Sequence, residues 1–167
     1  MKRILLLLIL IGSALITKAQ RATYADLKYV LYHNVDEVQD YLLQKGFTFG
    51  GIDTIGDSRE EIDYHFTKNS SNSLNYISVS KKSINEIFYE VSFFTLKQED
   101  YIRLKQSVKS LGYKLTSTSV NKGTLISNFV KGNLGIDFWT TRNNEDNVTN
   151  YYISLTDLKR KSEAFSN

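Results

Sequence analysis

The chain has 167 residues, with 21 Lys and Arg against 18 Asp and Glu, and it contains no Cys and no Pro. The lack of Cys excludes disulfide bonds, thiolate catalysis, Cys-ligated zinc and lipid attachment at a cysteine. Lys2, Arg3 and Lys18 supply the whole excess of positive charge, because the first 19 residues hold no acid. The rest of the chain carries as many bases as acids, which argues against a nucleic-acid-binding protein.

The first 19 residues follow the plan of a secretory signal peptide. A cationic start at 1–3 precedes an apolar stretch at 4–16, and the small residues Thr17 and Ala19 stand at the −3 and −1 positions of the expected cleavage after Ala19. The apolar stretch is too short to span a membrane, since a spanning helix needs about 20 residues. We therefore expect a secreted or periplasmic protein with no transmembrane anchor after cleavage.

Two short helices are expected at the start of the mature chain. Thr23 and Asp26 match the Ser/Thr-x-x-acid signal at a helix N-terminus, and apolar residues at helical spacing predict a helix over 23–32. Asn34 with Glu37 predicts the start of a second helix. The pattern is typical of a helix–loop–helix.

After residue 46 the apolar pattern changes to a period of two. Ile62, Tyr64 and Phe66 alternate with polar residues, as expected for a strand with one buried face. The same pattern predicts strands near 47–51, 62–67, 74–81 and 87–93.

The second half of the chain repeats this plan. Thr95 with Gln98 predicts a capping box for a helix that ends at Gly112. Four strands are expected at about 113–120, 124–131, 134–141 and 149–156. The charged tail, 159–167, is expected to be flexible and to fray.

An internal repeat organises these elements. Gly46-Phe47 and Gly112-Tyr113 each close a helix and open a strand, and the segment 89–97 is similar to 151–159. We predict one α+β domain over 20–158, made of two tandem helix-plus-four-strand repeats at about 23–95 and 96–158. The two repeats would form a mostly continuous antiparallel sheet with helices packed on one face.

This organisation resembles the architecture of beta-lactamase-inhibitor proteins over residues 23–156. The resemblance is one of topology, without a shared sequence motif, and members of that family use disulfides that this chain lacks. It implies a curved sheet with helices on one side and an open concave face that binds a partner. It does not imply the same target.

Alternation along the predicted strands places an unusual set of side chains on the face away from the helices. Aromatic residues stand there among acids, and clustered exposed aromatics mark interaction surfaces. The candidate partner-binding residues are Tyr76, Phe88, Phe94, Trp139, Tyr152, Asp63, His65, Glu90 and Asp137. The alternative is that a loop or the second repeat covers them, or that a misplaced bulge reverses a face.

The leading hypothesis is a non-enzymatic binding module, inhibitor- or immunity-like, whose partner is a protein or another macromolecule. One alternative is a hydrolase that uses the carboxylates of Asp63 and Glu90 with His65. Another is an envelope structural or assembly protein without a discrete ligand. We expect no cofactor and no metal, because His33 is the single further histidine and no metal-ligand spacing or phosphate-binding loop occurs.

Overall fold

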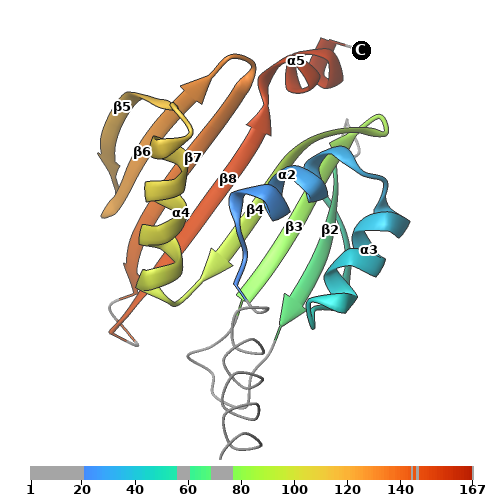
Figure 1. Cartoon of the computed structure of the whole chain (residues 1–167), viewed down its shortest axis with the longest axis horizontal. Coiled ribbons are helices and arrows are strands. Elements are labelled where there is room, and N and C mark those ends of the chain that lie inside the picture. The colour runs from blue at the N-terminus through green and yellow to red at the C-terminus, as the bar shows by residue number, and fades with distance from the viewer. Residues whose placement is uncertain (1–20, 56–60, 69–76, 144, 146, 167) are drawn as a thin grey trace, which may run out of the picture.

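The computed structural model describes residues 21–55, 61–68, 77–143, 145 and 147–166. The described residues form four helices and one eight-stranded antiparallel sheet, which confirms the predicted α+β class (Figure 1). The predicted signal peptide lies outside the described residues. Among the helices of the described part, none is long and apolar enough to cross a membrane.

The sheet consists of two antiparallel meanders joined side by side. The helices are α2 (Tyr24–Tyr32), α3 (Val35–Gln44), α4 (Gln98–Ser110) and α5 (Leu158–Ser166). The strands are β1 (Thr48–Ile55), β2 (Glu61–Lys68), β3 (Ile77–Ile84), β4 (Ile87–Thr95), β5 (Lys114–Asn121), β6 (Thr124–Lys131), β7 (Leu134–Asn143) and β8 (Val148–Asp157), and their order in space is β1-β2-β3-β4-β8-β7-β6-β5. The continuous sheet is as predicted, whereas the tandem repeat stays a prediction.

Both predicted N-terminal capping boxes are confirmed. Thr23 Oγ1 accepts the backbone N–H of Asp26 at 3.2 Å, and Asn34 Oδ1 accepts that of Glu37 at 2.9 Å. Each acid in turn accepts the backbone N–H of the capping residue. These bonds satisfy donors that a helix N-terminus otherwise leaves unpaired, so the local sequence fixes where α2 and α3 begin.

The predicted capping box at Thr95 and Gln98 is wrong. The N-cap of α4 is Lys97, which makes no side-chain capping bond. Thr95 is fully buried as the last residue of β4, and its hydroxyl accepts the backbone N–H of Lys97 at 3.0 Å. Pairing with β8 holds this threonine in the sheet, out of reach of the first turn of the helix.

The helices α3 and α4 end in the same way. Gly46 and Gly112 both have positive φ angles, a conformation that glycine adopts without steric cost. The next residues, Phe47 and Tyr113, donate their backbone N–H to the carbonyl five residues earlier, which is the bond of a Schellman motif. Both aromatic residues are buried, so each helix end leads the chain directly into the core.

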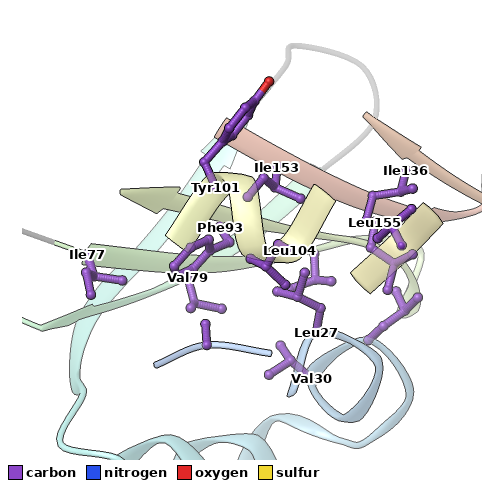
Figure 2. Packing of buried hydrophobic residues seen from close by; sticks show 14 of the residues in the cluster. Leu27, Val30, Ile77, Val79, Phe93, Tyr101, Leu104, Ile136, Ile153 and Leu155 are labelled. Carbon is purple, nitrogen blue, oxygen red and sulfur yellow. The ribbon is translucent and has the colours of Figure 1, made fainter. Parts of the chain in front are cut away.

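The core lies between the sheet and three of the helices. Figure 1 shows α2, α3 and α4 on the same side of the sheet, and α2 and α4 both contact β4 and β8. Figure 2 shows side chains of the two helices facing those of the strands. The largest apolar residues of this layer that are almost fully buried are Leu27, Val30, Leu31, Phe66, Phe93, Leu104, Ile136, Phe138, Ile153 and Leu155.

A bulge in β4 changes which side chains face the helices. Lys82 pairs with Glu90 and the next residue of β3, Ser83, pairs with Phe88, so Tyr89 is an extra residue in its strand. An extra residue shifts the alternation by one. The strict alternation that we expected from Ile87 to Phe93 therefore fails at this point.

The prediction that Phe88 lies on the face away from the helices is consequently wrong. Its ring lies 4.0 Å from the Nζ atom of Lys81, a fully buried residue bound to α2, and 6.0 Å from the ring of Tyr64. Tyr89 takes the opposite face, where burial and the carboxylates of Glu61 and Glu90 raise its pKa.

The tail that we expected to be flexible forms the helix α5. Ala164 is fully buried against Ile84 and Tyr89, and the rings of Phe165 and Tyr89 meet edge to face at 5.8 Å. Arg160 lies over the ring of Tyr32 in α2. A few apolar contacts are thus enough to hold this strongly charged segment as a helix. The helix α5 packs at one end of the sheet (Figure 1).

A buried lysine joins the sheet to the C-terminus of α2. The Nζ atom of Lys81 donates hydrogen bonds to the carbonyls of Val30, Leu31 and His33 at 2.5, 3.2 and 2.6 Å. These carbonyls belong to the end of α2, where backbone oxygens lack helical partners. Lys81, which belongs to β3, therefore caps the C-terminus of α2.

Lys81→Met should lower the free energy of unfolding by about 2–3 kcal/mol, because it leaves buried carbonyls without a donor while keeping the size of the side chain. Lys82→Met is the matched control. Lys82 is half-buried on the other face, beside Glu61, and such pairs contribute about 1 kcal/mol or less. Urea unfolding measures both, and equal losses in the two variants would contradict the capping role.

Stability should also depend on pH through Lys81. Burial, assisted by the nearby charge of Arg160, lowers the pKa of Lys81 from 10.5 to about 7. Between these values the unfolded chain binds a proton that the folded chain lacks, so the free energy of unfolding rises with pH. The difference in stability between the natural chain and Lys81→Met should widen from pH 7 towards pH 10. A constant difference in urea unfolding across that range would show that Lys81 stays charged when folded.

Candidate functional site

The face of the sheet opposite α2, α3 and α4 carries a row of aromatic side chains. Phe94 of β4 pairs with Tyr152 of β8, and Tyr152 pairs with Trp139 of β7, so the three residues form a line across adjacent strands. The rings of Phe94 and Tyr152 lie 4.8 Å apart. Trp139 and Tyr152 are each 42% exposed. We call this surface the open face and these three residues the aromatic row.

A second line of side chains, all polar, runs beside the aromatic row. Ser92, Ser154, Asp137 and Asn128 pair in that order across β4, β8, β7 and β6. We call them the polar row. Because side chains two residues apart share a face, Asp137 stands next to Trp139 and Ser154 next to Tyr152. The open face thus offers apolar rings and hydrogen-bonding groups side by side.

Asp137 is the carboxylate at the centre of this surface. It is half-buried, and it forms no hydrogen bond and no ion pair within the described part of the chain. Burial raises its pKa, and the negative charge of Glu90 acts in the same direction. Lys161 of α5 lowers it by a smaller amount. The carboxylate is therefore held without a close counter-ion of its own.

A group of charged side chains lies at the β1–β4 side of the open face. His65 Nε2 lies 3.1 Å from Asp53 Oδ2 and 3.7 Å from Asp63 Oδ2. Asp63 is 5% exposed and its Oδ1 atom has no hydrogen-bond partner among the described residues. Burial raises the pKa of Asp63, and the charges of His65 and Lys82 oppose that shift.

Glu90 belongs to the same group through Lys82. The Nζ atom of Lys82 lies 3.3 Å from Glu61 and 4.0 Å from Glu90. The carboxylate of Glu90 also accepts hydrogen bonds from Ser92 and Thr156 at 3.4 and 3.3 Å. Unlike Asp137, Glu90 has hydrogen-bond donors and a cation close to it within the chain.

Most of the predicted site residues lie on one surface. The open face holds Phe94, Trp139, Tyr152, Asp63, His65, Glu90 and Asp137. Phe88 lies on the helix-covered face, and Tyr76 lies outside the described residues. The acids do not form one cluster, because Asp63 in β2 and Asp137 in β7 are separated by three intervening strands.

Asn128 was not among the predicted site residues. It pairs with Asp137, its Nδ2 donates to Ser117 at 2.9 Å, and its Oδ1 atom is shielded from water without a described partner. The alternation of apolar and polar residues along β6 could have placed Asn128 on the open face. That alternation is hard to see in the sequence, because Ser127 is polar although it is buried on the core side.

The described residues offer no metal site, and the chain has no match among known proteins in the comparisons. Among the described residues, no group of three or more His, Cys, Asp or Glu side chains is arranged to hold a metal ion. Comparisons with protein-family models, curated proteins and solved structures find no match to the chain.

If the aromatic row is a surface and not part of the core, truncating it should cost little stability. Trp139→Ala and Tyr152→Ala should each lower the free energy of unfolding by about 1 kcal/mol or less, because each side chain already contacts water. Phe138→Ala is the control, since this neighbouring residue is fully buried and should cost about 3–5 kcal/mol. A loss at Trp139 as large as that at Phe138 would show that the row is covered. Chemical denaturation followed by far-UV circular dichroism measures all three.

Proposed function

We propose that this protein is a secreted or periplasmic, non-enzymatic binding module whose open face takes up a macromolecular partner. The aromatic row carries the proposal. Trp and Tyr provide large contact areas with few rotatable bonds, and they are enriched among the interface residues that contribute most of the binding free energy. Two such residues, each 42% exposed and in line on a rigid sheet, are more than a solvated sheet face needs.

The location outside the cytoplasm rests on the first 19 residues, whose cationic start, apolar stretch and small residues Thr17 and Ala19 match the plan of a signal peptide. The absence of Cys is compatible with this location, because the core is large enough to hold the fold without disulfides. The proposed resemblance to beta-lactamase-inhibitor proteins favours an inhibitor- or immunity-like role, with the target undefined.

The charged side chains support binding better than hydrolysis. A hydrolase would need Asp63, His65 and Glu90 to act on one substrate, with one carboxylate available as a base. Instead, Glu90 is engaged by Lys82 and Thr156, and His65 Nε2 already faces two carboxylates. The side chains of this group therefore contact one another, Lys82 through ion pairs with Glu61 and Glu90 and His65 through its closeness to two carboxylates.

A pull-down with the mature chain, residues 20–167, should capture a stoichiometric partner from the native envelope or culture fluid. The double variant Trp139→Ala/Tyr152→Ala should lose this partner, because it removes the exposed rings and leaves the core intact.

The matched control is Leu43→Ala/Ile102→Ala, which removes exposed apolar residues from the helices α3 and α4. This control should capture the partner as well as the natural chain does. Capture that is unchanged by the sheet variant, or lost in both variants, would contradict the proposal. A chain that captures nothing would favour an envelope structural role.

A further inference from the structure

We propose that the open face recognises a cationic side chain of a protein partner, an arginine or a lysine, and that Asp137 and Trp139 bind it together. The inference rests on the proposed function, because it names the chemistry of the partner at the same surface. Three independent features of that surface carry it: an unpaired carboxylate, a second unpaired acceptor beside it, and aromatic rings next to both.

The first feature is the carboxylate of Asp137. Within the described residues it has neither a hydrogen bond nor an ion pair, although it is half-buried in the middle of a sheet. A carboxylate in such a position loses part of its hydration without gaining a partner within the described chain. A cation brought by another molecule would remove that cost and gain a charge-assisted hydrogen bond.

The second feature is the amide of Asn128, directly across from Asp137 in the adjacent strand. Its Nδ2 group is used by Ser117, while its Oδ1 atom is shielded from water and accepts no hydrogen bond from the described residues. The unpaired amide oxygen places a negative partial charge beside the carboxylate, and together they favour a guanidinium or ammonium group, which carries several donors and no acceptor.

The third feature is the aromatic row. Trp139 follows Asp137 by two residues on the same strand face, and Tyr152 pairs with Trp139. A guanidinium stacks on aromatic faces while it binds a carboxylate edge-on, and Trp is the strongest ring for this contact. The exposed rings also accept the aliphatic stem of the same side chain.

The charge of the surrounding surface favours the same ligand. Asp53, Asp63, Glu61 and Glu90 lie along the β1–β4 side of the open face with Lys82 among them, and Lys161 stands near Asp137. Acids therefore outnumber bases on the β1–β4 side of the open face, and a negative surface attracts a basic segment before contact.

The test uses the single tryptophan of the chain as its reporter. The indole N–H of Trp139 gives one resonance in a nitrogen-15 correlation spectrum of the mature protein, and N-acetyl-arginine amide is the probe. We expect a saturable shift of that resonance with a dissociation constant in the millimolar range, about what one side chain can supply. The citrulline analogue has the same shape without the charge and should bind about tenfold more weakly.

Two variants separate the site from a general effect. Asp137→Asn should abolish the preference for arginine over citrulline while leaving the rest of the spectrum unchanged. Glu99→Gln removes an exposed acid from the first turn of α4, on the other face, and should bind the arginine probe like the natural chain. No saturable shift, or an equal shift in Asp137→Asn, would overturn the inference.

The outcome also distinguishes this inference from the proposed function. If the partner is captured through Trp139 and Tyr152 but the arginine probe does not bind, the binding module stands and the cation is wrong. Saturable binding of tri-N-acetylglucosamine without binding of the arginine probe would likewise overturn the inference, in favour of a glycan on the same rings.

Discussion

The pairing of β4 with β8 is the interaction on which the rest of the structure depends. Six residue pairs, from Glu90 with Thr156 to Thr95 with Tyr151, join two meanders that come from different halves of the chain. Without this ladder each meander would expose an additional edge. The same ladder puts Phe94 beside Tyr152 and Ser92 beside Ser154, so the two rows of the open face exist only because the halves are joined.

The asymmetry between the two faces follows from where the helices pack. The helices α2, α3 and α4 cover one face, and most of the buried apolar side chains lie between these helices and the sheet. Lys81 fixes the end of α2 to β3 with bonds that its neighbour on the strand, Lys82, cannot make from the opposite face. Among the described helices, α5 alone packs against the other side, and it covers Tyr89 and Ile84 at one end.

Local signals in the sequence were enough for much of this fold and for most of the open face. The capping residues Thr23 and Asn34 and the glycines 46 and 112 act within one turn, so their effect can be predicted without tertiary contacts. The failures share a physical cause, which is long-range pairing. The bulge at Tyr89 depends on the register with β3, and α5 depends on contacts with β4. The burial of Lys81, for which no prediction was made, likewise depends on the distant carbonyls of α2. None of these is encoded in the period of a single strand.

The most direct test of the central claim is site-specific photocrosslinking in the cell that produces the protein. A photoreactive phenylalanine analogue would replace Tyr152 on the open face and, in a separate chain, Ile102 on α4, since both positions are 42% exposed. We predict one discrete adduct from position 152 and none of the same mass from position 102. The same adducts from both positions, or none from position 152, would contradict the claim that the open face binds a specific partner.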